Sequence, residues 1–262
     1  MKTFVVPWDG QPETERAAPI AAALARRWDA ELVVAMVTSL PDPARRDLDR
    51  LVARLGATAV HTQVIESNDV VGSISAVVQS TADPVLCMTT HARGRIGTAI
   101  LGSVAAGLLR DARCPVVLVG PHCVDEWPAG DDRLLTSLDE SPTSEAIITS
   151  ASEWSRALGL ELWLAEVFHP LDVESARAPY RFLDTIVERL RPDVPDVRAC
   201  VAWNRYVPGE ILHLAHTLRV SMIAMATHGH TGLAQVALGS VTMAVAHGAP
   251  CPVLTARPTD LR

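Results

Sequence analysis

Two glycines and a serine near the end of the chain are residues that could let a loop approach phosphate. Gly229 and Gly239 are separated by nine residues, and Ser240 follows where a helical pattern begins. Glycine lets backbone N–H groups approach phosphate oxygens, and the start of a helix adds the positive end of its dipole. Such a loop binds phosphate without a lysine. The alternative is purely structural, because any parallel α/β sheet needs glycine-rich turns after its strands.

The same frame occurs twice in the chain. The Leu-Gly-Ser-Val run at 101–104 recurs 137 residues later, at 238–241. Two further pairs match at a spacing of 130 residues: Asp9 with Asp139, and Val37 with Val167. The second copy therefore carries an insertion of seven residues, which we place within 168–195. Two matched blocks with one local insertion indicate tandem domains.

Each copy alternates short β-branched runs with amphipathic helical stretches, the pattern of a parallel sheet with helices on its faces. The predicted strands are residues 3–6, 32–37, 59–64, 85–88 and 116–119 in the first copy and 134–137, 160–167, 197–202, 222–226 and 253–255 in the second. A predicted helix over 13–28 carries one apolar stripe. Prolines, a glycine and acidic residues between the copies predict an exposed linker. The predicted domains are thus 1–121 and 132–262, with the linker at 122–131.

Composition limits the possible classes of function. Of the 262 residues, 48% are hydrophobic and 20% are charged, which is typical of globular domains. The net charge of −7 and the lack of a Lys/Arg run predict no nucleic-acid binding. No apolar run is long enough for a membrane span or a signal peptide, so we expect a cytoplasmic protein with no membrane contact. Five scattered cysteines predict small, buried, reduced side chains.

The loop of the second copy resembles that of nucleotide-binding universal stress proteins, which carry G-x-x-G-x(9)-G-[ST] after their fourth strand. Gly229, Gly239 and Ser240 match this motif, and Ala226 stands at its first glycine. The resemblance covers about 120 residues in each copy. It implies a tandem universal stress protein with two Rossmann-like (adenine nucleotide α-hydrolase-like) α/β domains. Each would have a five-stranded parallel sheet of order 3-2-1-4-5 and helices on both faces, with its ligand crevice between strands one and four.

The resemblance also implies nucleotide-binding residues, carried over by position. In the second domain, the preferred site, they are Asp139, Val167, Met225, Ala226, His228, Gly229, Gly239, Ser240 and Val241. In the first domain, the weaker site, they are Pro7, Asp9, Val37, Met88, Thr89, His91, Gly102, Ser103 and Val104. Thr89 and Ala92 replace family glycines, and a β-branched residue costs roughly 1–2 kcal/mol if its φ must be positive. Two features favour binding in the first domain. Pro7 and Asp9 match the family's Pro-x-Asp, and Arg93 and Arg95 offer phosphate contacts. The two sites can therefore differ in the ligand they bind rather than in affinity alone.

The aspartates and histidines of these sets also have structural interpretations. An aspartate after the first strand is often a helix N-cap. In the second copy Ser141, followed by proline, is the better cap, which leaves Asp139 for a ligand. His91 and His228 either contact the ligand or fix the loop by hydrogen bonding.

No catalytic or metal site is predicted. Ser240 lies in no G-x-S-x-G elbow and has no clear base partner, and His213 and His216 lack a third metal ligand nearby. The resemblance implies a stress-response sensor or regulator that binds ATP or ADP, with or without Mg²⁺, and is at most a slow ATP hydrolase. Two alternatives stay open. One is an interaction module with empty sites. The other is an enzyme related to the adenine nucleotide α-hydrolases, which would need a phosphate loop that residues 7–11 lack.

The fifth strand of each copy is expected at a sheet edge. In the order 3-2-1-4-5 it is outermost, and an open apolar edge promotes aggregation. In the family these edges pair with each other. The resemblance therefore implies an intramolecular pseudo-dimer through residues 116–119 and 253–255. A homodimer and unidentified protein partners are the other assemblies to test.

Overall fold

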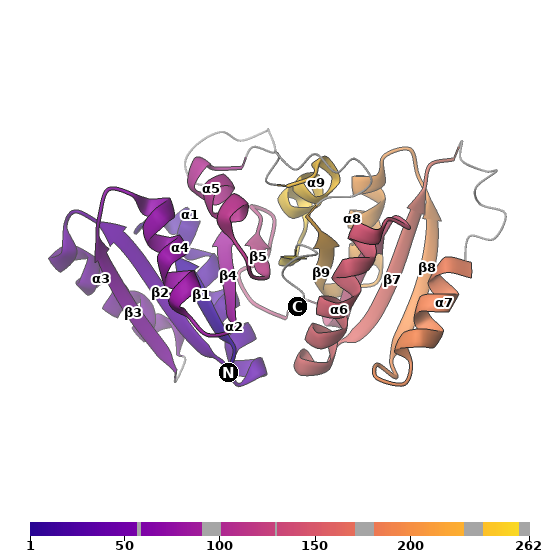
Figure 1. The fold of residues 1–262 in the computed structure, drawn as a ribbon, viewed down its shortest axis with the longest axis horizontal. Helices are drawn as coiled ribbons and strands as arrows, with labels where there is room; N and C mark the ends of the chain where they lie inside the picture. The colour runs from indigo at the N-terminus through magenta and orange to yellow at the C-terminus, as the bar shows by residue number, and fades with distance from the viewer. Residues whose placement is uncertain (57–58, 91–100, 129, 171–180, 228–237, 257–262) are drawn as a thin grey trace.

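The computed structural model describes residues 1–56, 59–90, 101–128, 130–170, 181–227 and 238–256. The chain forms two α/β halves side by side (Figure 1). The first half contains β1 (Thr3–Pro7), α1 (Pro12–Glu15), α2 (Ala17–Trp28), β2 (Glu31–Thr38), α3 (Pro41–Leu55), β3 (Val60–Glu66), α4 (Val70–Ser80), β4 (Pro84–Thr89), α5 (Ser103–Asp111) and β5 (Val116–Val119). The second half contains β6 (Asp131–Leu138), α6 (Pro142–Leu158), β7 (Glu161–Phe168), α7 (Arg181–Leu190), β8 (Val197–Trp203), α8 (Val207–Thr217), β9 (Val220–Ala226), α9 (Ser240–Gly248) and β10 (Val253–Ala256).

The described strands form one ten-stranded sheet in the order β3-β2-β1-β4-β5-β10-β9-β6-β7-β8. Neighbouring strands within each half are parallel. The halves join where β5 and β10 run antiparallel, with Leu254 opposite Val117, so the expected pairing of the fifth strands is observed. The predicted α/β class with two tandem domains is confirmed.

Helices cover both faces of the sheet, and each face has its own core. One cluster of buried side chains includes residues of α2, α3, α6 and α7, and the other includes residues of α4, α5, α8 and α9. Both clusters draw residues from both halves, so the core is continuous across the β5–β10 junction. The residues of β5 and β10 are all buried and apolar apart from Thr255, as is usual where helices cover both faces. Within the described ranges no helix is both long and apolar enough to cross a membrane.

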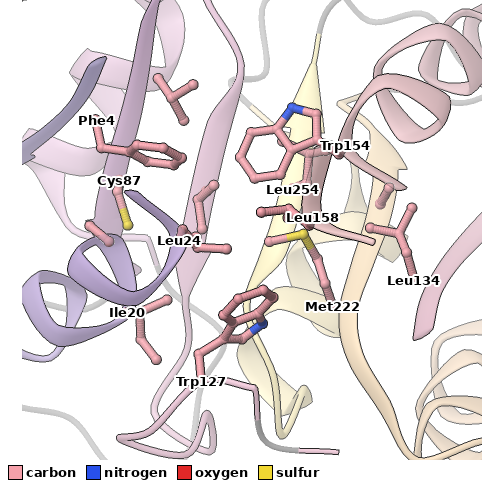
Figure 2. Packing of buried hydrophobic residues seen from close by; sticks show 14 of the residues in the cluster. Phe4, Ile20, Leu24, Cys87, Trp127, Leu134, Trp154, Leu158, Met222 and Leu254 are labelled. Atoms are coloured by element: carbon pink, nitrogen blue, oxygen red, sulfur yellow. The ribbon is translucent and has the colours of Figure 1, made fainter. Parts of the chain in front are cut away.

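Three aromatic rings connect the two halves on one face of the sheet. Trp154 of α6 lies 4.8 Å from Trp28 of α2 and 6.0 Å from Phe4 of β1, measured between ring centroids, and both pairs are edge to face. Figure 2 shows Phe4 and Leu24 of the first half facing Trp154 and Leu254 of the second. This arrangement makes the contact between α2 and α6 part of the core rather than a surface contact.

The helix predicted over 13–28 is two helices, so that prediction is wrong at its start. α1 ends at Glu15, Arg16 separates the two, and α2 begins at Ala17. Pro19 has no N–H group to donate to the carbonyl of Glu15, which removes one bond that a continuous helix would need. The predicted apolar stripe remains on α2, where most residues are buried against the sheet.

The predicted exposed linker is wrong in part. We call residues 120–128 the interdomain strap. Its Cys123 and Trp127 are 2% and 7% exposed, and Trp127 Nε1 donates a hydrogen bond of 2.8 Å to the carbonyl of Ser221. Proline and glycine correctly marked irregular backbone, but they carried no information about what these two apolar side chains cover. β6 also starts at Asp131, inside the predicted linker.

The cysteines behave largely as predicted. Cys87, Cys114, Cys123 and Cys251 are buried and Cys200 is half-buried, and all five are free thiols. Burial is the main cause that raises the pKa of the Cys123 thiol to about 12. The thiol of Cys123 is therefore protonated at neutral pH and unreactive in the folded chain.

The aromatic contact between the halves predicts a large effect for Trp154→Ala. Because Trp154 is fully buried, truncation should lower the free energy of unfolding by about 3–5 kcal/mol. Urea unfolding followed by circular dichroism measures this. The matched control is Trp203→Ala, since Trp203 is 45% exposed and should lose far less. Equal losses in the two variants would show that the contact between the halves contributes no special stability.

Candidate functional site

The described residues of the predicted first-domain site surround one cavity. The cavity has a volume of about 220 Å³ and lies at the carboxyl ends of β1, β2 and β4. Its lining includes Pro7, Asp9, Val37, Met88, Thr89, Gly102, Ser103 and Val104. His91, the remaining member of that set, lies outside the described residues. The structure thus brings together side chains that are up to 97 residues apart in the sequence.

The strand order positions this cavity. β1 pairs with β2 on one side and with β4 on the other, so the carboxyl ends of these three strands meet at one edge. The chain leaves β1 toward one face and leaves β4 toward the other, which opens a crevice between them. Apolar side chains from α4 and α5 form its floor, among them Val70, Ile74, Ala105 and Leu108. Sequence reasoning missed this floor, because the same apolar periodicity marks any core-facing helix.

Both predicted phosphate-loop helices begin at a glycine. Gly102 and Gly239 occupy the N-cap positions of α5 and α9, with φ of −59° and −64°. Their N–H groups bond to the carbonyls of Thr90 and Thr227, at 3.2 and 2.7 Å, which fixes each helix start to the end of the preceding strand. These φ values suit any residue, so the glycines matter for space rather than for conformation. A glycine at this position has no side chain to cap the first-turn N–H groups or to shield them from an anion.

Asp9 is held by the turn that follows β1. Its Oδ1 accepts hydrogen bonds from the N–H of Gln11, at 3.1 Å, and from the hydroxyl of Thr14. Thr14 lines the cavity as well, so a polar wall of two side chains faces the apolar floor. Thr14 was not among the predicted residues. The only signal for it in the sequence is its place in the turn after Asp9.

The conformational cost considered for Thr89 does not arise. Thr89 is the last residue of β4, pairs with Val119 of β5, and is not among the residues with positive φ. Thr89 can therefore oppose ligand binding only by the space it takes up, because it lines the cavity where the glycine of the family motif would leave room.

The second-domain residues occupy the equivalent strand ends. Val167 is near the end of β7, Met225 and Ala226 end β9, and Gly239 precedes α9, which begins with Ser240 and Val241. Met225 and Ala226 are buried, whereas Ser240 is exposed. His228 and Gly229 belong to 228–237, outside the described residues. The described part of the chain therefore places the seven other members at the expected edge.

The prediction for Asp139 is half right. Ser141 caps α6, accepting from the N–H of Ser144 at 3.0 Å, with Pro142 in the first turn as expected. Asp139 is nevertheless not left to a ligand alone. Its Oδ1 accepts from the N–H and hydroxyl of Ser141, at 3.2 and 2.6 Å. An aspartate two residues before the cap readily forms this Asx turn, which sequence reasoning did not weigh.

Glu166 is a buried acid that sequence reasoning missed. It lies in β7 beside the predicted Val167, is 3% exposed, and its Oε2 has no hydrogen-bond partner among the described residues. Burial first, and then the negative charges of Glu140 and Asp139, raise the pKa of Glu166 to about 7. The repeat offered a signal for this residue. The matching position of the first copy holds the apolar Met36, so an acid in the second copy is a departure from the shared pattern.

The chain belongs to the universal stress protein family, which it matches twice, over residues 1–120 and 132–257. The two matches correspond to the two halves of the sheet, so each half is one universal stress protein domain.

Relatives carry the same family name. A universal stress protein of Mycobacterium tuberculosis is 29% identical over 189 residues, covering 66% of this chain and 61% of that relative. A second one from the same species is 26% identical over 233 residues, covering 83% of this chain and 75% of the relative. A universal stress protein of Mycolicibacterium smegmatis is 31% identical over 180 residues. The match thus spans about three fifths of the length of the first of these relatives.

Solved structures share the fold over the whole chain. A universal stress protein from Archaeoglobus fulgidus DSM 4304 aligns with a TM-score of 0.71 at 17% identity, covering 98% of each chain. A functionally unknown protein from Pseudomonas aeruginosa PAO1 aligns with a TM-score of 0.70 at 17% identity, covering 99% of this chain and 93% of that one. At this identity the likeness establishes the fold alone.

The raised pKa of Glu166 predicts pH-dependent stability. Between its ordinary value of 4.5 and about 7, the folded chain keeps a proton that the unfolded chain has released. Stability should therefore fall as the pH rises through this window, by at most about 3 kcal/mol from this group. Glu166→Gln stays neutral and should lack this component. Urea unfolding of both proteins at about pH 5 and about pH 8 tests it, and an identical pH dependence would show that Glu166 does not titrate as described.

Proposed function

We propose that the chain binds an adenine nucleotide, ATP or ADP, and acts as a stress-response sensor or regulator through the bound state. The observation that carries the proposal is the first-domain cavity, which the described members of the predicted site all line. Membership of the universal stress protein family and the repetition of the same frame in the second domain support it.

The lining divides into parts that suit a nucleotide. Val37, Met88 and the apolar floor offer a surface for a flat base. The carboxylate of Asp9 is an acceptor for sugar hydroxyls. The first turn of α5, from Ser103 onward, presents backbone N–H groups to phosphate, and the glycine before it leaves them accessible.

Binding rather than turnover is the activity that this lining supports. Its described part contains no lysine, histidine or arginine that could activate a water or stabilise a leaving phosphate. The second candidate is an interaction module with empty sites. Thr89 and Ala226 favour this candidate, because the nucleotide-binding motif of the family has glycine at both positions.

The glycine N-caps allow a direct test in the intact chain. Gly102→Val and Gly239→Val place a branched side chain over the first-turn N–H groups without straining the backbone. Calorimetric titration with ATP should show affinity reduced at least about tenfold at the altered site, equivalent to 1.4 kcal/mol. Because Ala226 leaves more space than Thr89, Gly239→Val should remove the tighter site.

Smaller variants at the same positions serve as the control. Gly102→Ala and Gly239→Ala add one methyl group and should weaken ATP binding less than valine does. Melting temperatures of all four variants should stay close to that of the wild type. Valine variants that melt far lower and still bind ATP with wild-type affinity would show that these glycines are structural and that the site is misplaced. Absence of ATP binding to the wild type would favour the interaction module.

A further inference from the structure

Arg16 connects the first domain to the interdomain strap. Its Nε donates to Asp125 Oδ1 at 2.8 Å, and its Nη1 donates to the carbonyls of Pro121, at 2.9 Å, and Gly120, at 3.4 Å. Its Nη2 donates to the carbonyl of Cys123. A guanidinium has five N–H donors, and all three of its nitrogens are engaged by this one segment. The side chain is 29% exposed, so these bonds are partly shielded from water.

The strap in turn contacts the second domain. The N–H of Val124 donates to the carbonyl of Pro250 at 3.0 Å, and the indole of Trp127 donates to the carbonyl of Ser221. Gly120 lies so close to the carbonyl of Ala246 that a Cβ there would collide with it. Ala246 belongs to α9, the helix that begins at the predicted phosphate loop of the second domain.

Arg16 also adjoins the wall of the first-domain cavity. It follows α1 directly, and the α1 residue Thr14 lines the cavity. The Thr14 hydroxyl has one proton and two acceptors within reach, Asp9 Oδ1 and, at 3.1 Å, the carbonyl of Gln11. The hydroxyl proton can go to either acceptor, and the carbonyl of Gln11 also accepts from the N–H of Glu15 and the indole of Trp8. A ligand that donates to Asp9 Oδ1 would compete with Thr14 for this oxygen and favour the bond from Thr14 to Gln11.

Space is available for α1 to respond. A hollow of about 100 Å³ lies between α1 and the strap, lined by Glu13, Arg16, Thr89, Val119, Gly120 and Pro121. Thr89 lines both this hollow and the main cavity. A shift of α1 into or away from the hollow would move the Arg16 guanidinium relative to the strap carbonyls without disturbing a packed core.

We propose that Arg16 couples the state of the first-domain cavity to the docking of the second domain. The choice of nucleotide as the natural trigger rests on the proposed function. The coupling itself is a property of Thr14, Arg16 and the strap. It belongs to one domain only, because the residue that matches Arg16 in the second copy is Ala146. By linkage, undocking of the strap would change ligand binding by the same factor as ligand binding changes docking.

A ligand-free experiment on the full chain tests the coupling. Thr14→Val removes the hydroxyl that chooses between Asp9 and Gln11 and keeps the side-chain shape. Hydrogen exchange of the Val124 amide, which reports on docking of the strap, should change about fivefold or more. In the Arg16→Gln background the same Thr14 substitution should change it less than about twofold. If Arg16→Gln does not fold, Arg16→Lys serves instead, since an ammonium lacks the fork needed to span Asp125 and three carbonyls.

Arg27→Gln is the matched control. Arg27 is 31% exposed and also links the halves, through Asp132 at 2.6 Å and the carbonyl of Gly159, and its guanidinium lies 5.6 Å from the ring of the strap residue Trp127, but it is not among the residues that line the cavity. The Thr14 effect should persist in that background. An effect of equal size with and without Arg16, or no effect of Thr14→Val on Val124 in the wild-type background, would overturn the inference.

Saturating ATP provides the second arm. ATP should alter exchange at Val124 in the wild type and leave it unchanged in the Arg16 variant. Bound ATP with no change at Val124 in the wild type contradicts the inference. Failure of ATP to bind the wild type contradicts the proposed function instead, and the Thr14 arm still decides whether Arg16 couples the cavity to the strap.

Discussion

The antiparallel pairing of β5 with β10 is the constraint on which the rest of the molecule depends. Each strand would otherwise be the apolar edge of a five-stranded sheet, and together they convert two sheets into one. The pairing aligns the two faces, so that α2 meets α6 and the rings of Trp28 and Trp154 share a core. It also makes the strap a docked structural segment rather than a tether, because its Cys123 and Trp127 are buried and it bonds to both halves.

The two halves are repeats of one frame, but they are not equivalent. The first has Trp8 and Met36 where the second has Leu138 and the buried acid Glu166. Arg16 of the first half binds the strap, and the matching position in the second half holds Ala146. Under the proposed function, differences of this kind would let one domain respond to a ligand while the other responds to pH or to its neighbour.

Sequence reasoning reached the architecture because that information is local and repeated. The two halves and their junction could be predicted from strand-length β-branched runs, from the residue pairs repeated in the two copies, and from the position of the fifth strand at a sheet edge. Gly102 and Gly239 also lie at the helix starts expected for them. It could not reach features that depend on three-dimensional surroundings. The burial of Trp127, the Asx turn of Asp139 and the position of Thr14 in the cavity wall follow from which elements happen to approach, and no periodicity encodes that.

The central claim is that this fold holds an adenine nucleotide in the intact chain, and native mass spectrometry of the purified protein tests it most directly. The predicted spectrum shows the chain with one or two added ligands, and denaturing the same sample releases ATP or ADP. Added ATP should fill any remaining site. A spectrum of the bare chain alone, unchanged even with ATP in large excess, would contradict the claim.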